Sequence, residues 1–389
     1  MRAFRSVFIP ALALIGCTAA TDAGNAGQQN AGQSATDEAN RPFQVAEIAQ
    51  FREPWAMVFL PGGRQALITE KRGQVKLWTV GGQAVDVAGV PAVAYGGQGG
   101  LGDVVLHPDF ANNNYVYLSY AEAGEGNMRH AAVGRGRLVT EGGSPRIEGF
   151  QVIWRQEPSF EGRGHYGHRL LFSPDGQFLY VSSGERQQFD PAQDRNSNAG
   201  KIVRLSDTGM VPSDNPFYDQ GRIISQVWSL GHRNPLGMAW DGDGRLWEIE
   251  MGPQGGDELN IVERGANYGY PIVSNGDHYD GRPIPDHDTR PEFAAPKITW
   301  TPVISPGNMI YYTGSMFPQW RGDLLVAGLS SQAIVRIDID GTNAREAERF
   351  PMGQRIREIE QHPDGSLYIL EDERNGSGGR LLRLTPAGS

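Results

Sequence analysis

A strand–turn–strand unit that recurs along the chain is the feature that most limits how this sequence can fold. In each copy an apolar run leads into a turn that contains Pro, Asp or Gly, and a second apolar run follows. The six copies are AMVFLPGGRQALITE, VVLHPDFANNNYVYLSY, LLFSPDGQFLYVSSG, MAWDGDGRLWEIE, MFPQWRGDLLVAG and IEQHPDGSLYILED. Several continue into a third strand, as in GQVKLWTV, GKIVRLS, AIVRIDID and GRLLRLTP.

These units predict an all-β six-bladed propeller. Successive copies are roughly 45 to 75 residues apart, which is near or above the length of one propeller blade. A single unit would leave a sheet face exposed, so the units have to stack around an axis. We expect the early strand FQVAEIAQ to close the ring by pairing with the last blade.

The start of the chain has the pattern of a bacterial secretion signal. Arg2 and Arg5 precede an apolar run, Val7 to Ile15, which is too short to span a bilayer. The ending Leu-Ile-Gly-Cys17 resembles a lipobox, in which the Cys is lipidated. With Thr18 after it, the resemblance implies an anchor on the periplasmic side of the outer membrane. The alternative is a plain signal peptide that leaves a periplasmic protein.

Composition then divides the chain into three parts. Residues 1–17 are the predicted signal peptide with its lipobox Cys. Residues 18–41 are rich in Ala, Gly, Gln, Asn and Thr and predict a disordered tether. Residues 42–389 have a uniform texture and predict one propeller domain.

Charge and cysteine content exclude several function classes. The net charge of −10 offers no basic surface for phosphates, so we expect no nucleic-acid partner. The single cysteine, Cys17, excludes an internal disulfide and a Cys-based metal site. It also excludes a C-x-x-C-H haem motif, so any electrons have to leave to a separate acceptor.

Gly-rich polar loops lie between the strands and are expected to gather at one mouth of the propeller channel. They bring together the candidates His165, His168, Gln98, Arg233, Asn234, Arg355 and Arg357. Several Arg side chains beside neutral acceptors indicate an anionic ligand with planar carboxylates. The alternative for any one Arg is a solvated charge or a structural ion pair.

The loop EGRGHYGHR poses its own question, because His165 and His168 are three residues apart. They could be metal ligands, a catalytic base, or ordinary loop polarity. The residues alone leave all three interpretations open.

Four stretches taken together resemble a known family. GQGGLGDVVLHPDF, GHRNPLGMAW, GPQGGDELNIVERGANYGYP and GQRIRE are similar, in this order, to the soluble aldose sugar dehydrogenases that depend on pyrroloquinoline quinone (PQQ). The resemblance runs from about Pro54 to Pro386. It implies a six-bladed propeller with the cofactor at the channel mouth. It also implies oxidation of an aldose mono- or disaccharide at its anomeric carbon to a lactone.

The resemblance assigns roles residue by residue. His165 falls at the catalytic base, and Arg233 at the group that stabilises negative charge on the quinone oxygen. The cofactor's polar edge and its carboxylates would be bound by Gln98, Asn234, Arg355 and Arg357. The last two are two apart, so on a strand they would face the same side.

The resemblance also implies calcium. One ion would be bound by the backbone carbonyls of Gly252 and Pro253, and a second by the Glu258 side chain and the Tyr268 carbonyl. The alternative for Asp257-Glu258 is a solvated acidic turn.

Two positions depart from the family pattern. His168 stands where the family has Gly, and we assign it no role. Ser330 stands near where the family has a Lys that helps to bind the cofactor, so one positive charge is missing. Glu185 and Gln188 fall at further polar pocket positions.

Two other functions remain open from the sequence. A lactonase-type metallohydrolase would use His165 and His168 as base or ligands, but it should surround its metal with carboxylates and amides rather than Arg. A non-catalytic binding propeller, like that of the hedgehog-interacting protein, would not need the whole set of polar loop residues.

Overall fold

The structure, a computed structural model, describes residues 41–374 and 378–388. In this part of the chain the strands form six antiparallel sheets of four strands each. The first three sheets are β2 (Pro54–Phe59), β3 (Gln65–Glu70), β4 (Gln74–Thr79) and β5 (Ala84–Val87); β6 (Leu101–Leu106), β7 (Tyr115–Ala123), β8 (Arg129–Val139) and β9 (Arg146–Arg155); and β10 (Leu170–Phe172), β11 (Phe178–Ser183), β12 (Lys201–Ser206) and β13 (Val227–Leu230). The other three are β14 (Pro235–Trp240), β15 (Leu246–Glu250), β16 (Asp257–Ile261) and β17 (Ile298–Trp300); β18 (Pro306–Tyr311), β19 (Leu324–Gly328), β20 (Ala333–Asp340) and β21 (Asn343–Pro351); and β22 (Ile356–Gln361), β23 (Leu367–Glu371), β24 (Arg380–Pro386) and β1 (Phe43–Gln50).

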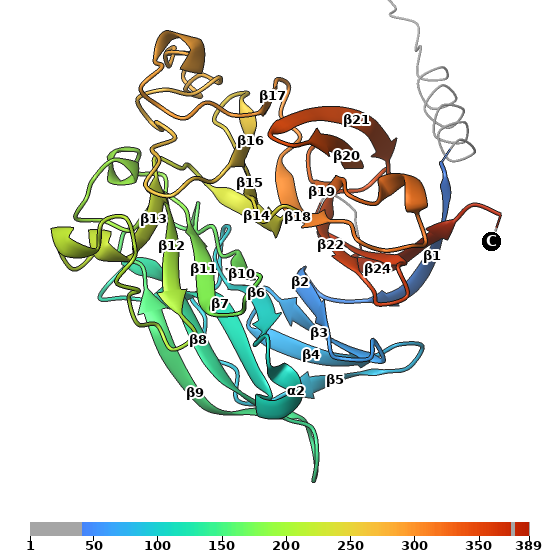
Figure 1. Ribbon diagram of the computed structural model, residues 1–389. Helices are drawn as coiled ribbons and strands as arrows, with labels where there is room; N and C mark the ends of the chain where they lie inside the picture. The colour runs from blue at the N-terminus through green and yellow to red at the C-terminus, as the bar shows by residue number, and fades with distance from the viewer. Residues whose placement is uncertain (1–40, 375–377, 389) are drawn as a thin grey trace, which may run out of the picture. The chain divides into compact units, whose positions relative to one another are not determined.

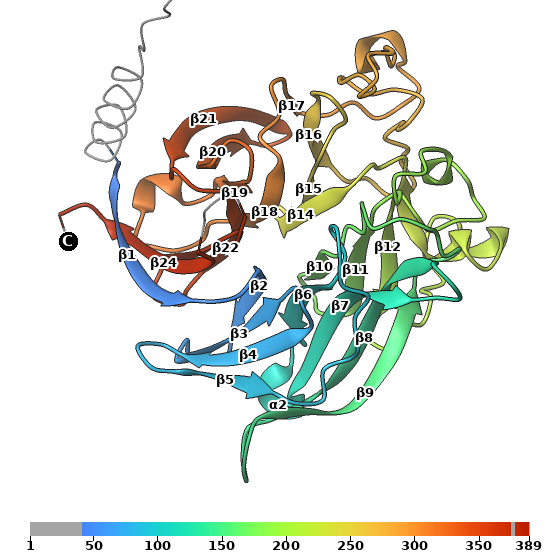
Figure 2. The same ribbon diagram turned by 180° about the vertical axis from the view of Figure 1, so that it is seen from behind.

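The six sheets follow one another around a ring in chain order, from blue to red in Figures 1 and 2. The first strand of each sheet lies nearest the centre of the ring (Figure 1), where β14, β18 and β22 contact one another in turn. This arrangement confirms the predicted all-β six-bladed propeller. Helical segments in the described residues are short: α2 (Phe110–Asn113), η1 (Asp190–Ala192), η2 (Tyr218–Gln220), η3 (Ile224–Gln226), η4 (His287–Thr289) and η5 (Pro318–Trp320).

The apolar core lies between neighbouring sheets rather than in one central mass. Leu67 of β3 shares a cluster with Leu101 of β6 and Leu118 of β7. Trp247 of β15 packs likewise with Val326 of β19 in the next sheet. Each sheet therefore covers a face of its neighbour, which explains why the inner strands are continuous apolar runs.

The first strand closes the ring, as expected. β1 pairs antiparallel with β24, from Phe43 opposite Pro386 to Gln50 opposite Arg380. The Phe43 ring also packs edge-on against Trp320 at 5.9 Å and Phe350 at 5.4 Å, between ring centroids. The sixth sheet thus combines both ends of the described chain.

One strand prediction was wrong. We expected MFPQW to be the first strand of the fifth unit, but its last three residues form the short helix η5. Pro318 has no N–H for a strand ladder and suits the first position of a helix. Phe317 and Trp320 are buried and stacked at 4.4 Å, which fixes the turn. The inner strand of this sheet is β18 instead.

The topology puts two sets of loops at the same end of the ring. In an antiparallel sheet, the start of the first strand and the end of the second lie side by side, as Pro54 opposite Glu70 shows. A register shift follows near the start of the inner strand in five sheets, at β2, β6, β14, β18 and β22. Such bulges change the direction in which side chains point, and here they lie at the channel mouth.

Arg169, just before β10, connects all six sheets. Its guanidinium donates to the carbonyl oxygens of Leu236 and Gly307, each at 2.9 Å. Its Nη1 bonds Asp103 at 3.2 Å and Glu358 at 3.1 Å. It also lies 4.4 Å from the centre of the Trp55 ring. These partners belong to the other five sheets, so Arg169 occupies the propeller axis.

Pro42 to Ser389 form one compact unit. The predicted signal peptide, Cys17 and the tether up to residue 40 lie outside the described residues, so they stay predictions. Among the residues described, no helix is both long and apolar enough to cross a membrane.

Candidate active site

Two cavities flank one loop at the channel mouth. The first, of about 190 Å³, is lined from all six sheets or the loops that enter them, by residues that include Trp55, Gln98, His168, Asn234, Ser305 and Arg357. The second, of about 240 Å³, is lined by residues that include His165, Glu185, Arg233, Pro253, Tyr270 and Tyr279. Because Arg233 and Asn234 are consecutive, the two cavities adjoin at the loop before β14. Most of the predicted site residues therefore gather at one end of the propeller, around these two neighbouring cavities.

His165 is held by a buried carboxylate. Its Nδ1 pairs with Oε1 of Glu185, while Oε2 of Glu185 accepts the backbone N–H groups of Gln188 at 2.6 Å and Phe189 at 2.7 Å. Burial disfavours the charged form of Glu185, but these hydrogen bonds outweigh it and lower its pKa. Nε2 of His165 has no protein partner among the described residues and belongs to the wall of the second cavity. This geometry is that of an oriented imidazole with one free nitrogen.

The charge state of His165 follows from the same surroundings. Burial lowers its pKa below the usual value by more than the Glu185 hydrogen bond raises it, and the Arg233 guanidinium lowers it further. The imidazole is therefore neutral near pH 7, and Nε2 can accept a proton.

Arg233 and Asn234 are positioned through Glu250, at the end of β15. Oε2 of Glu250 accepts both backbone N–H groups, from Arg233 at 2.5 Å and from Asn234 at 3.0 Å. The Arg233 guanidinium then donates to the carbonyl oxygens of Met251 at 2.9 Å and Gly252 at 2.5 Å. One carboxylate thus holds the loop at which the two cavities adjoin.

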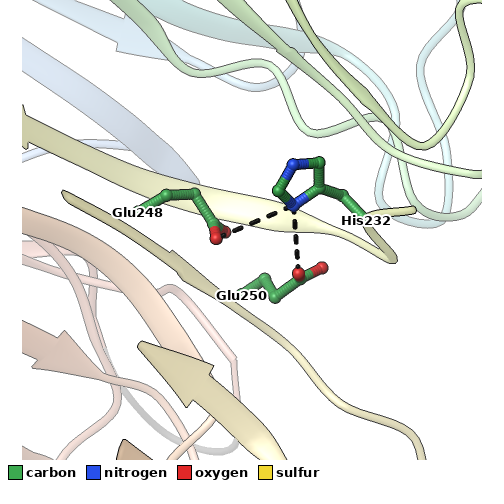
Figure 3. Close-up of side chains that lie close together, drawn as sticks. All are labelled: His232, Glu248 and Glu250. Carbon is green, nitrogen blue, oxygen red and sulfur yellow. Dashed lines mark hydrogen bonds and ion pairs between the residues drawn. The ribbon is translucent and has the colours of Figure 1, made fainter. Parts of the chain in front are cut away.

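Figure 3 shows Glu250 beside His232 and Glu248, a group that could be taken for a metal site. Both ring nitrogens of His232 have protein partners, however: Ser229 Oγ at 2.8 Å from Nε2, and Glu250 Oε1 at 3.2 Å from Nδ1. Burial raises the pKa of Glu248 well above its usual value, and the neighbouring Glu250 carboxylate adds to the shift. A neutral Glu248 and an engaged His232 make this a hydrogen-bonded support for the Arg233–Asn234 loop.

Gln98 and Asn234 both line the first cavity, and each uses its side-chain oxygen on the His165 loop. Gln98 Oε1 accepts the backbone N–H of His165 at 2.8 Å. Asn234 Oδ1 accepts the N–H of Gly167 at 3.1 Å. The two amides therefore keep N–H donors for a ligand while they hold the loop that carries the candidate base.

Arg355 and Arg357 lie where a carboxylate-binding pair was expected, with one difference. Arg355 precedes β22 and only Arg357 lies on it, because the strand begins at Ile356 and its register shifts before Glu358. Both nevertheless reach Oδ2 of Asp372, at 3.1 and 3.4 Å. Arg374 reaches the same oxygen at 3.1 Å.

The residues expected to bind calcium offer hard oxygen donors. The Gly252 carbonyl already accepts a positive group, the Arg233 guanidinium, and Pro253 lines the second cavity. Glu258 and Tyr268 line a further small cavity together with Glu250. Burial raises the pKa of Glu258, and Oε1 of Glu258 lies 3.3 Å from His287 Nε2. The donor set fits a hard cation at both places.

Three predictions about single residues can be compared directly with the structure. The alternative of a solvated acidic turn at Asp257-Glu258 was wrong, because both residues lie on β16 and are buried. Ser330 is exposed, donates to the Val303 carbonyl at 3.0 Å and does not line the first cavity. Gln188 is exposed, and its backbone rather than its side chain supports Glu185.

His168 lies in the wall of the first cavity rather than beside His165. Its ring stacks on Tyr166 at 5.2 Å and meets Trp55 edge-on at 5.9 Å. Burial lowers its pKa to about 3, so the imidazole is neutral. The two histidines line different cavities, which removes the shared metal site that a lactonase would have built from them.

Several residues of these cavities lie outside the predicted set, among them Lys71, Glu250, Tyr279, Asp372 and Arg374. One positional signal was available. Lys71, Glu185 and Asp372 are each the first or second residue after the second strand of a sheet, where the chain reaches the mouth. Tyr279, by contrast, comes from a long insertion between β16 and β17 that no strand pattern places.

Comparisons with known proteins show the family to which the chain belongs. Residues 51–383 match the family model described as glucose / sorbosone dehydrogenase. The chain is 39% identical over 341 residues to the aldose sugar dehydrogenase YliI of Escherichia coli (strain K12), covering 86% of this chain and 90% of that protein.

Solved structures show the same similarity. A glucose dehydrogenase crystal structure has a TM-score of 0.84 at 40% identity, covering 88% of this chain and all of that one. The PQQ-bound aldose sugar dehydrogenase of Streptomyces coelicolor has a TM-score of 0.73 at 29% identity, covering 88% of this chain and 98% of that one. The match over most of the chain, together with the site at the channel mouth, leads to one conclusion: this protein belongs to the glucose/sorbosone dehydrogenase family and is a sugar-oxidising oxidoreductase.

Proposed function

We propose that this protein oxidises aldose sugars at the anomeric carbon to lactones, with PQQ as hydride acceptor and calcium as an essential ion. The observation that carries the proposal is the His165–Glu185 pair, which points a free imidazole nitrogen into a cavity beside Arg233. The PQQ-bound relative and a quinoprotein glucose dehydrogenase of Acinetobacter calcoaceticus, 25% identical over 408 residues, support the choice of cofactor.

The residues of the first cavity suit the quinone. Arg355 and Arg357 would bind carboxylates, and the amide N–H groups of Gln98 and Asn234 would bind the polar edge. Trp55 and Tyr166 offer aromatic walls for a planar ring system. When bound, the quinone supplies a two-electron acceptor, and calcium supplies a Lewis acid next to it.

His165 accepts the proton that the sugar loses. Nε2 takes the proton of the sugar's anomeric hydroxyl while the hydride leaves the anomeric carbon, so the sugar loses one proton and one hydride and becomes a lactone. The Glu185 carboxylate stabilises the imidazolium that forms and holds the ring in place. The Arg233 guanidinium, in the same cavity, stabilises negative charge that develops beside it.

Calcium would be bound through main-chain oxygens of Gly252 and Pro253, and a second ion through Glu258 and the Tyr268 carbonyl. Both places offer oxygen ligands of the kind that a hard cation prefers.

The substrate is an aldose mono- or disaccharide, and the electrons pass to a separate acceptor. The second cavity is open, and Tyr270 and Tyr279 line it with faces on which a sugar ring can stack. We also propose that the protein is anchored through Cys17 on the periplasmic side of the outer membrane. Radiolabelled palmitate in the mature protein, lost on Cys17→Ser, would test the anchor.

The decisive test adds PQQ to the purified protein, with and without calcium, and follows dye reduction with a panel of aldoses. Activity that requires quinone, calcium and sugar together would support the proposal. Sugar oxidation without quinone, or quinone binding without any sugar oxidation, would contradict it.

A further inference from the structure

The side of the first cavity formed by the sixth sheet has more positive charge than its own carboxylate balances. Arg355, Arg357 and Arg374 all donate to a single oxygen, Oδ2 of Asp372, at 3.1, 3.4 and 3.1 Å. Arg357 is only 6% exposed, and burial lowers its pKa to about 10. A buried guanidinium needs acceptors for its five N–H groups, and among the described residues one shared oxygen leaves most of the Arg357 donors unmatched.

Lys71 brings a further positive charge to the cavity from the first sheet. It follows β3 directly, and its Nζ donates to the Gly97 carbonyl at 2.5 Å. An ammonium group has three N–H donors, so this bond uses one of them. Burial lowers the pKa of Lys71, and the Arg374 and Arg357 guanidiniums lower it further against the opposing effect of Glu53. Lys71 is therefore within electrostatic reach of the guanidiniums of the sixth sheet.

The charges that line the cavity do not cancel. They comprise four cations, Lys71, Arg355, Arg357 and Arg374, against two carboxylates, Glu53 and Asp372, an excess of 4 − 2 = +2. Glu53 is moreover engaged with Arg72, at 2.7 Å, and with the Tyr95 hydroxyl. This excess stands in a chain whose net charge is −10. Like charges held together in a partly buried site destabilise the empty protein and favour an anion with several negative charges.

We propose that Lys71 is a cofactor-binding residue of this protein, which pairs with a carboxylate of the ligand from the first sheet, next to the sixth sheet that carries Arg357. The inference rests on the proposed function, since the ligand class is a planar aromatic compound with more than one carboxylate. A cofactor-binding Lys71 would also replace the positive charge that is missing at Ser330, which lies outside the cavity and is uncharged. The neutral His168 supplies no charge either. The positive charge is thus supplied by Lys71, from the first sheet.

The test compares the quinone affinity of four purified apo-proteins: wild type, Lys71→Gln, Lys71→Arg and the control Lys76→Gln. Lys76 lies on the next strand, β4, and pairs with Asp86 at 2.5 Å away from the cavity. Equilibrium dialysis with the absorbance of PQQ gives the Kd, and the quenching of the intrinsic tryptophan fluorescence checks this value. We expect Lys71→Gln to weaken binding about ten- to a hundredfold, as for a lost hydrogen bond to a charged group. We expect Lys71→Arg to keep most of the affinity and Lys76→Gln all of it.

A second readout separates a binding role from a structural one. Because Lys71 is repelled by its neighbours in the empty site, we expect apo Lys71→Gln to have the same Tm as wild type or a higher one. Unchanged quinone affinity of Lys71→Gln, or weaker affinity together with a lower Tm of the apo-protein, would overturn the inference and leave the proposed function intact. If wild type itself binds no quinone, the proposed function fails first.

Discussion

At the scale of single residues, the His165–Glu185 pair decides the chemistry. Replacing His165 with Ala removes the proton acceptor without touching the residues expected to bind the cofactor. We expect retained quinone binding and a kcat lower by about two orders of magnitude or more. Steady-state kinetics beside a quinone titration measure both. A variant with wild-type kcat would show that another group is the base.

Substitution of Glu185 gives a prediction about how the activity depends on pH. His165 has to be neutral to accept a proton, so activity falls as the pH drops through its pKa, which lies below the usual value. The Glu185 carboxylate raises that pKa, so Glu185→Gln should lower it further and move the acidic limb of kcat/KM to lower pH. The plateau should fall as well, because the imidazolium loses its counter-charge.

The control for this variant is Glu161→Gln, an exposed carboxylate near the start of the same loop. It should leave both the limb and the plateau unchanged. An acidic limb that stays in place in Glu185→Gln, or moves to higher pH, would mean that another group controls the profile.

At the scale of elements, the loop before β14 depends on one side chain at the end of β15. Glu250→Ala would leave the buried N–H groups of Arg233 and Asn234 without their acceptor. Each unpaired buried donor costs about 1–3 kcal/mol, so we expect the free energy of unfolding to fall by roughly 2–6 kcal/mol. Urea denaturation measures the change, with the half-exposed Glu148→Ala as control. A loss no larger than that of Glu148→Ala would show that water replaces the carboxylate.

The strands and turns also show which parts of the fold can be predicted from the sequence. Turns such as Pro-Asp-Gly at residues 174–176 gave the blade count, because turn chemistry is local. The inner strand β18 was missed, since Pro306 and Gly307 at its start look like a loop, and the buried Phe317–Trp320 stack in η5 looks like a strand. Local pattern does not distinguish the two when both are apolar.

The candidate site was predictable to a different degree. His165, Arg233 and the Arg355–Arg357 pair came from motifs, and the structure brings them to one end of the ring. Glu185, the partner of His165, also came from the motifs, but Asp372 did not, because it meets Arg355 only through the pairing of β23 with β22. Contacts between strands far apart in sequence depend on register, which the motifs do not contain.

At the scale of the whole molecule, one charge at the axis holds the sheets in their ring. Arg169→Met would leave the buried Asp103 and Glu358 without their cation and would remove the hydrogen bonds to Leu236 and Gly307. Breaking a buried ion pair by removing one partner costs about 3–5 kcal/mol. We expect a loss of this size near neutral pH, and little change in the half-exposed control Arg146→Met.

The dependence of this loss on pH distinguishes an ionic role of Arg169 from simple packing. Burial already raises the pKa of both Asp103 and Glu358. The Arg169 charge opposes the rise at both carboxyls, and at Asp103 the backbone N–H groups of Leu170 and Val104 oppose it as well. Without Arg169 the two carboxyls stay protonated in the folded state to higher pH, while in the unfolded chain they ionise near pH 4. The folded variant then binds more protons than the unfolded one, so its stability falls as the pH rises. The defect measured by urea denaturation should be smaller at pH 5 than at pH 8, whereas an equal defect at both would assign Arg169 a packing role alone.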